Sequence, residues 1–284
     1  MFEINEEDYL HINASFSNPI KFKLTTRGLY SEVCCLLDAM VFALHKRRRL
    51  LVDETEFFSL HWSGLFDAEL PKWNAEQDKV VEELTIHKSK RFNMLRSEWH
   101  IPFWINSTHR FSSVFTVQSK LAKVFCKPKL RERFALTPFA AIQLRRGDKT
   151  NGYYVGDKLV KESAESPIAS YVTLLRQHAQ KLSDVFVLTD DYRAFEEIVV
   201  LAPEFNFQTY CPQSDAGYVH PEFLALPESE KRSRLEKLVK SVDICGQAEI
   251  FIGPFHSNPS RFVPLIKGTR KGCFSTDHRR HWMP

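Results

Sequence analysis

The sequence lacks the features that mark several large classes of protein. No apolar run approaches the roughly 18 residues that a membrane-spanning helix needs. The N-terminus, MFEINEEDYL, is acidic where a secretory leader would be basic. The net charge of +4 is small for a protein devoted to nucleic acid, which usually concentrates a large basic excess on one face. We therefore expect a soluble, cytoplasmic protein with no nucleic-acid partner and no membrane span.

Cysteine pairs at short spacing are also missing. The chain has six cysteines and no CxxC motif, and two of the six are adjacent inside an apolar run. This usage predicts buried thiols in a reducing compartment, and neither a disulfide framework nor a zinc site. The six are Cys34, Cys35, Cys126, Cys211, Cys245 and Cys273.

What the sequence does have is the balance of an ordinary globular protein. Hydrophobic residues make up 43% and charged residues 26% of the 284 residues, a length that suits one large domain or two of Rossmann size. Aromatic residues reach 13%, including 23 Phe. A Phe-rich core explains most of them, and rings that stack on a sugar or a base are the second possibility.

The N-terminal half begins with a strand, helix and strand pattern. A short alternating run at 22–26 ends at Gly28 and is followed by an amphipathic stretch at 31–46, which predicts a helix. Three arginines at 47–49 follow, where cations favour a helix C-terminus, and 50–53 predicts a second strand. This order is typical of a parallel α/β unit.

The pattern blurs between residues 57 and 111, and a helix is predicted at 116–133. The break at Thr137-Pro138 is our predicted domain boundary, which gives an N-terminal α/β domain at 1–136 and a C-terminal α/β domain at 137–284.

The C-terminal half alternates strands and helices more cleanly. This alternation predicts a parallel sheet covered by helices on both faces, in which ligands bind beyond the carboxyl ends of the strands. The predicted strands are 139–144, 185–188, 205–210 and 250–252, and the predicted helices are 167–182, a second one before residue 205, 228–244 and 257–266.

Arg145 and Arg146 follow the first of these strands and precede Gly147, which allows a tight turn. A guanidinium is always charged and presents a fork of donors that matches phosphate oxygens. Because neighbouring strand residues point to opposite faces, we expect one arginine to meet a ligand and the other to brace Asp148 or Asp190. Taken alone, the pair is a weak signal, and a solvated bridge between loops explains it better than a ligand site does.

Two further strand ends carry polar residues. Ser257 and Asn258 begin a predicted helix, whose free amides form an anion site, and a simple N-cap is compatible with that role. His256 beside them is a candidate for lining the site. Asp190 and Asp191 fit either a divalent-metal site or a structural pair in which Asp191 caps the next helix, and we favour the structural role.

Three segments together resemble the donor half of the α1,6-fucosyltransferase family. They are Gln-Leu-Arg-Arg-Gly-Asp-Lys at 143–149, Val-Phe-Val-Leu-Thr-Asp-Asp at 185–191 and Ser-Val-Asp-Ile-Cys-Gly-Gln-Ala-Glu-Ile-Phe-Ile-Gly-Pro-Phe-His-Ser-Asn at 241–258, with Arg261 after them. The resemblance covers residues 140–266. It implies a GT-B-like α/β fold, with two Rossmann-type domains facing across a cleft. It also implies metal-independent, inverting transfer of a sugar from a nucleotide-sugar donor to a glycan acceptor, with no cofactor.

The resemblance also implies roles for single residues. Arg145 would bind the β-phosphate of the donor, Lys149 would be another donor contact, and Asp243 would bind the nucleobase. Ser257 and Asn258 would hold the pyrophosphate, and Asp190 and Asp191 would be the family's paired aspartates. With these we group three neighbours as candidate donor-binding residues: Gln143, Arg146 and His256. The donor domain would be 137–284 and the acceptor side 1–136.

Two positions depart from the family pattern. Gln143 stands where the family has a histidine that helps to recognise guanine, and Tyr153 stands where it has its catalytic glutamate. GDP-fucose and a UDP-sugar such as UDP-xylose therefore both remain possible donors. For the catalytic base we choose Asp157 first, because it lies in the loop after the arginines. The fallbacks are Glu162 and Glu165, and then Asp53 and Glu54 of the N-terminal half.

Two other interpretations stay open. The missing glutamate fits a nucleotide-sugar or glycan-binding module that has no catalytic activity. A metal-dependent sugar transferase built around Asp190 and Asp191 is the other.

Overall fold

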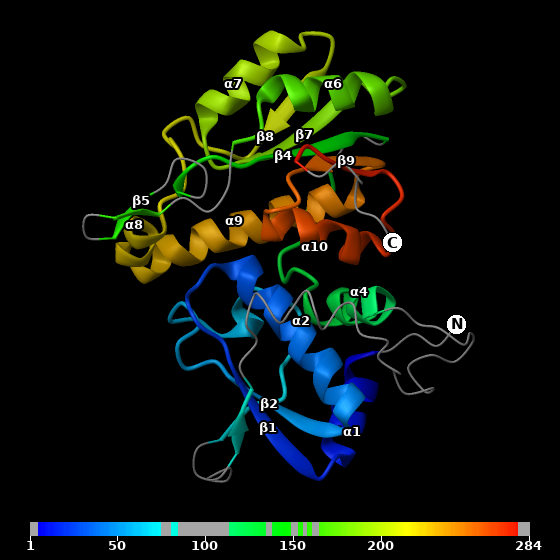
Figure 1. Cartoon of the computed structure of the whole chain (residues 1–284), viewed down its shortest axis with the longest axis vertical. Helices are drawn as coiled ribbons and strands as arrows, with labels where there is room; N and C mark the ends of the chain where they lie inside the picture. Colours follow the sequence, from blue (N-terminus) through cyan, green and yellow to red (C-terminus); the bar gives the residue numbers. More distant parts are fainter. Residues whose placement is uncertain are drawn as a thin grey trace. The chain divides into compact units, whose positions relative to one another are not determined.

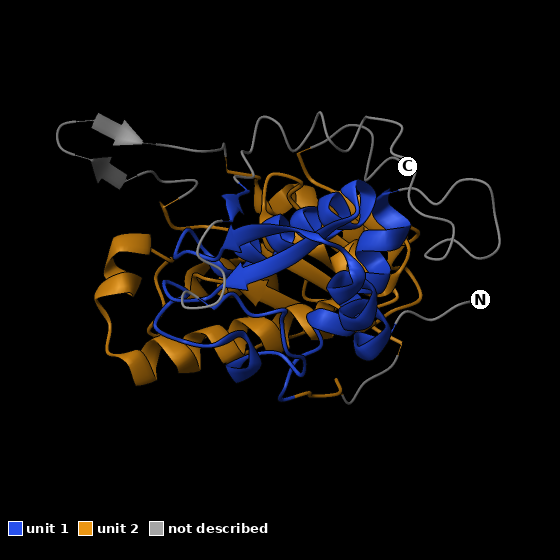
Figure 2. Ribbon diagram, turned by 90° about the horizontal axis from the view of Figure 1, so that it is seen from below, with its two compact units in different colours: residues 1–130 blue, residues 131–284 orange. Residues whose placement is uncertain are grey.

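The chain forms two compact units. The structure, a computed structural model, describes residues 5–74, 81–84, 114–134, 138–148, 153–155, 158–160 and 165–277, with only the backbone of 153–155 and 158–160. The contacts within the chain group residues Met1–Leu130 into one unit and Arg131–Pro284 into the other, which Figure 2 distinguishes by colour. This division falls a few residues before the boundary that the sequence predicts at 136/137. Phe134 belongs to the second unit because its ring packs on Phe139 and Phe186.

The N-terminal unit contains the predicted strand, helix and strand. Strand β1 (Asn18–Lys23) pairs in parallel with β2 (Arg48–Asp53) and with the short β3 (Glu82–Glu83), in the order β2-β1-β3. Helix α2 (Leu29–Lys46) joins β1 to β2 (Figure 1). Its residues are buried along almost its whole length. The remaining elements are α1 (Glu6–Ser15), the 3₁₀ helix η1 (Trp62–Gly64) and α4 (Val114–Phe125).

Several predicted boundaries in this unit are wrong. The strand expected at 22–26 ends at Lys23, because the amide and hydroxyl of Thr25 donate to the Glu32 carboxylate and turn the chain. Only Arg47 closes α2, in a left-handed conformation, and the next two arginines begin β2. The helix expected at 116–133 stops at Phe125, and Pro128 instead forms a bridge with Phe66.

The C-terminal unit contains a parallel five-stranded sheet in the order β10-β9-β4-β7-β8. Its strands are β4 (Ala140–Leu144), β7 (Asp184–Thr189), β8 (Asn206–Thr209), β9 (Ile250–Gly253) and β10 (Cys273–Ser275). Numbered along the chain this order is 3-2-1-4-5, that of a doubly wound fold, whose switch point lies between the first and fourth strands. A crevice for a ligand is therefore expected outside the carboxyl ends of β4 and β9.

Helices cover both faces of this sheet, as the sequence predicts. Helices α6 (Ile168–His178) and α7 (Tyr192–Leu201) lie on one face, and α9 (Glu228–Gln247) and α10 (Asn258–Lys267) lie on the other (Figure 1). The short helix α8 (His220–Ala225) and strand β10 are not predicted from the sequence. A two-stranded antiparallel ribbon consists of β5 (Tyr153–Val155) and β6 (Lys158–Val160).

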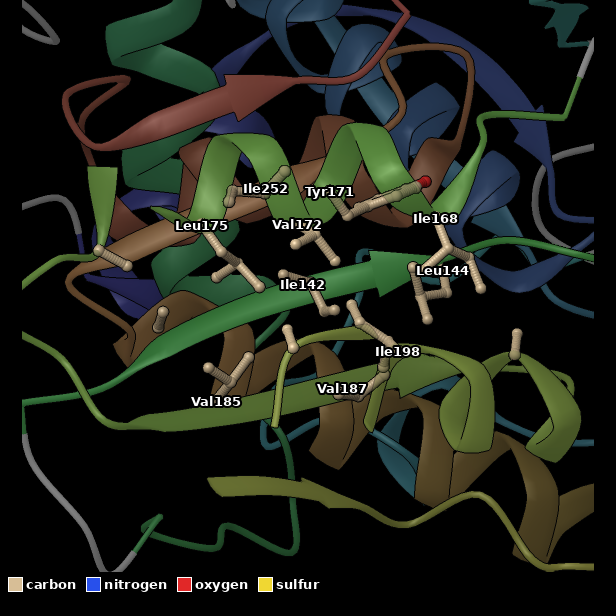
Figure 3. Close-up of a cluster of buried hydrophobic side chains, with 14 of the residues drawn as sticks. Ile142, Leu144, Ile168, Tyr171, Val172, Leu175, Val185, Val187, Ile198 and Ile252 are labelled. Atoms are coloured by element: carbon tan, nitrogen blue, oxygen red, sulfur yellow. The ribbon is translucent and has the colours of Figure 1, made fainter. Parts of the chain in front are cut away.

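One face of α6 packs on the sheet and fixes the strand from which the arginines leave. Ile168, Tyr171, Val172 and Leu175 follow the i, i+3, i+4, i+7 spacing of a single helix face, and all are buried. Figure 3 shows them directed at the side chains of β4 and β7, such as Ile142. Burial of each large apolar side chain contributes about 1.5–3 kcal/mol relative to its exposure, so α6 anchors the end of β4.

No helix in the described ranges is both long enough and apolar enough to cross a membrane. All six cysteines lie in described parts of the chain, and all are free thiols. Five of them are buried and Cys211 is half-buried.

Candidate functional site at the carboxyl edge of the C-terminal sheet

Arg145 leaves the end of β4 and is held by two carboxylates. Its Nη1 donates to Asp190 at the end of β7, and its Nη2 lies 2.8 Å from Asp148 Oδ1. The guanidinium also lies over the Tyr218 ring, 5.3 Å from its centre. The side chain is only 12% exposed. A guanidinium carries five N–H donors, so the two carboxylates fix its orientation and leave donors for an anion.

The loop before α8 closes over this arginine network. Asp190 Oδ1 accepts from the Arg146 amide at 2.8 Å, and Asp190 Oδ2 accepts from the Tyr218 amide at 3.2 Å. Asp148 in turn donates its amide to the Tyr218 carbonyl at 2.8 Å. Burial raises the pKa of the Tyr218 hydroxyl above its usual range, with Asp148 adding to the increase. Tyr218 therefore acts as a neutral platform beside the charged pair.

Gly147 makes this closure possible. Its φ is +70°, and a side chain at this position would overlap the backbone of Tyr218. Gly217, with φ +110°, approaches it from the facing loop. The tight turn that the sequence predicts is confirmed, and it brings two loops into backbone contact.

The Arg146 side chain bonds to residues other than those that hold Arg145. It is buried, and its Nη1 donates to the carbonyls of Arg145 at 3.2 Å and Ser166 at 3.3 Å. Its Nε lies 3.1 Å from the Glu165 carboxylate. The braces on Asp148 and Asp190 expected of one arginine come from the Arg145 guanidinium, while Arg146 ties the end of β4 to the start of α6.

Gln143 lies in β4, two residues before Arg145, and its side chain contacts α10. It is buried in β4, and its side-chain oxygen accepts a hydrogen bond from Ser260 on α10. A side chain at Gly253 would overlap the Ser260 hydroxyl, so the glycine lets α10 pack closely on β9. Gln143 therefore lies in the site region with its oxygen already used.

Helix α10 begins where the sequence predicts, next to the switch point. Ser257 occupies the N-cap position and is buried with Asn258, but the Ser257 hydroxyl makes no capping hydrogen bond. Pro259 follows and has no N–H. The first-turn amides of a helix have no partner within the helix and carry partial positive charge, which favours an anion.

His256 precedes this helix and is paired with Asp277, which follows β10. The His256 Nδ1 is hydrogen-bonded to the Asp277 carboxylate, which also accepts from the Phe255 amide at 2.6 Å and from the Ser275 hydroxyl at 2.7 Å. Burial alone would raise the pKa of Asp277, but the hydrogen bonds from His256, Ser275 and two amides outweigh it and hold the pKa well below its usual range. Asp277 is therefore ionised at neutral pH.

Asp191 has the structural role that we favour. Its carboxylate accepts from the Arg193 amide at 2.9 Å, which caps α7, and from the Arg193 guanidinium at 2.6 Å. Hydrogen bonds from Arg193 lower the pKa of Asp191. The described residues contain no group of three or more His, Cys, Asp or Glu side chains arranged to hold a metal ion.

Asp243 is not brought together with these residues. It lies in the last turns of α9, where it contacts Arg131 at 3.4 Å and Gln247 at 3.1 Å. Gln247 in turn bonds to the Glu132 carbonyl, before the start of β4. This neighbourhood is at the amino edge of the sheet, away from Arg145 and Ser257.

Four of the sequence-predicted residues cannot be placed in the same way. Lys149, Asp157 and Glu162 lie outside the described residues. Tyr153 begins β5, of which only the backbone is described. Of the fallback bases, Glu165 pairs with Arg146.

The two N-terminal fallbacks are engaged locally. Asp53 accepts from the amide and hydroxyl of Thr55 at 3.0 and 2.7 Å. Burial opposes ionisation of Asp53, but these bonds and the charges of Lys21 and Lys23 outweigh it and lower its pKa. Glu54 accepts from the Trp62 amide at 2.6 Å. The lowered pKa makes Asp53 a poor proton acceptor, and one oxygen of Glu54 is already occupied by the Trp62 amide.

The sequence alone did not identify Tyr218, Ser260 and Asp277 as parts of this region. Each lies far along the chain from its partner, and each contact depends on the strand order. One signal was available: Ser275 and Asp277 follow a short apolar pair after Gly272, as expected of a fifth strand with a polar end.

Comparison with known proteins supports the fold. No family model matches the sequence, and no curated protein matches it. Among solved structures, the chain is similar to a mutant of Arabidopsis thaliana FUT1 in complex with GDP, with 12% identity over 93% of this chain and 73% of that chain, at a TM-score of 0.55. At this identity the match shows the fold alone, an α/β fold of the GT-B type with parallel sheets, as the sequence predicts.

Two other solved structures are more distant. NodZ α-1,6-fucosyltransferase soaked with GDP-fucose has 14% identity over 88% of this chain and 92% of that chain, at a TM-score of 0.46. POFUT1 in complex with GDP has 14% identity over 89% of this chain and 95% of that chain, at a TM-score of 0.39.

Proposed function

We propose that the chain is an inverting glycosyltransferase that moves a monosaccharide from a nucleotide-sugar donor to a glycan acceptor. GDP-fucose is the first candidate donor, and a UDP-sugar such as UDP-xylose is the alternative. The observation that carries the proposal is the position of Arg145 and the uncapped N-terminus of α10 on the two sides of the switch point. A solved structure of similar fold is in complex with GDP, which supports a nucleotide ligand.

The proposed reaction places charge on the leaving group. The acceptor hydroxyl oxygen attacks the anomeric carbon, the bond from that carbon to the β-phosphate oxygen breaks, and the hydroxyl proton passes to a base. The products are the glycoside and a nucleoside diphosphate. Arg145 and the amides of α10 would stabilise the developing negative charge, and Lys149 would add a second cation. Ser257 and Asn258 would position the diphosphate, and residues 1–136 would supply acceptor contacts.

Arg145 is well suited to this role because it is already oriented. Asp148 and Asp190 hold it in one rotamer, so little side-chain entropy is lost when a phosphate binds. The two carboxylates have further donors of their own, from the amides of His220 and Arg146. Backbone amides therefore help to hold both carboxylates in place.

For the base we keep Asp157 as first choice and Glu162 as second. Glu165 is less suited, because its carboxylate is paired with Arg146. An Asp157→Asn variant should keep donor binding and lose most of its turnover, since a base acts in the transition state. Glu165→Gln is the matched control and should retain turnover. If Asn or Gln replacements at all three positions leave turnover within about threefold of wild type, the base lies elsewhere.

We also propose that no metal is required. Asp190 shares its two oxygens among Arg145 and two amides, and Asp191 shares its own with Arg193. Turnover should therefore persist in excess EDTA. Activity that is lost in EDTA and restored by Mn²⁺ would favour the metal-dependent alternative.

A nucleotide screen tests the proposal as a whole. We expect GDP or UDP to raise the melting temperature, whereas guanosine and uridine should have little effect, because the proposed contacts are to phosphate. ADP is the control for recognition of the nucleobase. Incubation of the stabilising nucleotide's sugar conjugate with an oligosaccharide pool should then release free nucleoside diphosphate. Binding without any release would favour the non-catalytic module, and no shift with any nucleotide would contradict the proposal.

A further inference from the structure

A pocket opens at the amino edge of the N-terminal sheet, where Asn18, Arg48 and Glu82 are the first residues of β1, β2 and β3. Its volume is about 580 Å³. Sites for small molecules typically have volumes of about 300–1,000 Å³. The other lining residues are Pro19 at the start of β1 and Phe42 and Lys46 near the end of α2. The pocket therefore combines apolar and charged surface within one unit.

Arg48 forms a fixed wall of this pocket. Its Nε donates to the Asn18 carbonyl at 3.4 Å, and its Nη2 donates to the Pro19 carbonyl at 3.0 Å. Its Nη1 donates to the Glu82 carboxylate at 2.6 Å. A guanidinium has five N–H donors, and a carboxylate has lone pairs beyond the one used here. The pair is therefore neutral as a whole and still presents a donor beside an acceptor.

Phe42 and Lys46 lie one turn apart on α2 and share one face of the helix. The Phe42 ring is half-buried, whereas Lys46 is exposed in the last turn. Within the described ranges Lys46 has no ion-pair partner. The one carboxylate among the lining residues, that of Glu82, is paired with Arg48. The charge of Lys46 is therefore not balanced by the lining.

These features select a class of ligand by its chemistry. One unbalanced positive charge favours a group with a single negative charge, since a dianion such as phosphate would also be repelled by the Glu82 carboxylate. The donor of Arg48 beside the acceptor of Glu82 suits hydroxyl groups, which both donate and accept. The Phe42 ring and Pro19 offer apolar surface to the C–H groups of a ring.

We propose that this pocket binds an acidic sugar residue, one whose ring carries a carboxylate. The carboxylate pairs with Lys46, the ring lies against Phe42, and hydroxyl groups bond to Arg48 and Glu82. No covalent bond forms or breaks. The inference goes beyond the proposed function, because every lining residue belongs to the N-terminal unit and binding needs no nucleotide.

The surroundings of the pocket add positive charge without selecting the ligand. Arg47 closes α2 and Arg49 follows Arg48 in β2, and both are exposed. Their charges attract any anion and are screened by salt. The preference for a carboxylate on a sugar ring over inorganic phosphate therefore depends on Glu82 and Phe42.

Two sugars that differ only at carbon 6 test the proposal. Methyl β-D-glucuronide has a carboxylate there, and methyl β-D-glucoside has a hydroxymethyl group. Both are titrated into the full chain without nucleotide, and binding is followed by saturation-transfer NMR. We expect the glucuronide to bind about threefold to fivefold more tightly, which is the effect of one exposed ion pair. The matching galactose-derived pair is titrated in the same way, and the tighter pair gives the preferred hydroxyl configuration.

Two variants separate the contact to the carboxylate from the contact to the ring. Lys46→Ala should abolish the preference for the acidic sugar and leave the affinity for the neutral sugar unchanged. Phe42→Leu should weaken both sugars by about threefold and keep the preference. Lys123→Ala is the matched control, because Lys123 is an exposed lysine in the last turn of α4 and does not line the pocket. Should Phe42→Leu not fold, as judged by its melting curve, Lys46→Ala still decides the question.

Several outcomes would overturn the inference. It is wrong if neither acidic sugar binds the wild type, if the neutral sugars bind as tightly, or if Lys46→Ala keeps the preference. Competition with inorganic phosphate completes the test: phosphate that binds more tightly than the preferred acidic sugar would mean a general anion site and contradict the proposal. Each of these failures leaves the proposed function standing, because the assay contains no nucleotide.

Discussion

The two units end their parallel strands in different ways. At the carboxyl edge of the N-terminal sheet, charged groups are satisfied within a few residues: Glu32 accepts from Thr25 and Arg27, and Asp53 from Thr55. At the carboxyl edge of the C-terminal sheet, Arg145 and its carboxylates connect three loops. At the N-terminal edge the charged side chains bond to nearby residues of the same unit. At the C-terminal edge the carboxylates hold the hydrogen-bond donors of Arg145 in place beside a switch point.

This difference explains why we assign the diphosphate to the C-terminal unit. Both edges contain a glycine, an arginine and a helix that follows a strand. The second edge adds an arginine that carboxylates from two loops orient and, across the switch point, a helix whose N-cap serine makes no capping bond. A strand-end arginine is thus informative about ligand binding only together with its surroundings.

The largest expected effect comes from Arg145→Ala. Loss of a charge-assisted phosphate contact, worth about 1.5–3 kcal/mol, should weaken nucleotide binding by at least about tenfold. Arg27→Ala is the matched control in the N-terminal unit, since Arg27 also pairs with a buried carboxylate, Glu32. Its nucleotide affinity should stay within about twofold of wild type. Calorimetry on both folded variants gives the comparison, and equal losses would remove the distinction between the edges.

Gly147→Ala should cause the next largest change. The positive φ and the overlap with the Tyr218 backbone add to about 3 kcal/mol, which lowers the melting temperature by about 6–10 °C. Gly28→Ala is the control, because Gly28 also has a positive φ but no atom within 4 Å of the added carbon. The melting temperature of Gly28→Ala should fall by about half as much. If the two variants have the same melting temperature, the close approach of the two C-terminal loops does not require a glycine at position 147.

Arg146→Ala should act on stability more than on binding. The buried guanidinium donates to two carbonyls, and its removal leaves them unsatisfied. We expect the melting temperature to fall by about 4–6 °C, with a smaller loss of nucleotide affinity than in Arg145→Ala. The opposite ranking, measured by thermal melts and calorimetry on the same samples, would exchange the roles of the two arginines.

The smallest expected effect is the pH-dependent contribution of the Asp277 carboxylate to the stability of the fold. Its pKa is lower in the folded protein than in the unfolded chain, so the ionised form stabilises the fold fully above about pH 4 and less as the pH falls below that value. At neutral pH we expect Asp277→Asn to melt about 2–4 °C below wild type. The gap should narrow between about pH 4 and pH 2.5. A gap that widens on acidification would contradict the assignment of the carboxylate.

The regular elements of the C-terminal unit were largely predictable from the sequence. Continuous apolar runs at β4 and β7 and the helical spacing at α6 carry strong local signals. Strand β10 has three residues and no such signal, and the same is true of the six-residue α8. The GT-B-type fold followed from the strong elements together with the three segments that resemble a known family.

The candidate site was predictable only in part. Arg145 and Ser257 could be named because strand ends and helix starts can be identified from local pattern. Their partners could not, because the order of strands in a sheet decides which loops meet, and that order is a property of the whole chain. Resemblance alone also misplaced one residue. Asp243 was assigned to the site through the resemblance, but it lies at the amino edge of the sheet.

The anchor of His256 has a consequence for how the protein is made. Strands β4, β7, β8 and β9 precede β10 in the chain, so during synthesis most of the sheet can pair before Asp277 leaves the ribosome. A nascent chain at that stage can already contain the Arg145 network, whereas the loop after β9 still lacks its carboxylate. The fixed conformation of the loop before α10 would therefore be among the last features that the growing polypeptide acquires.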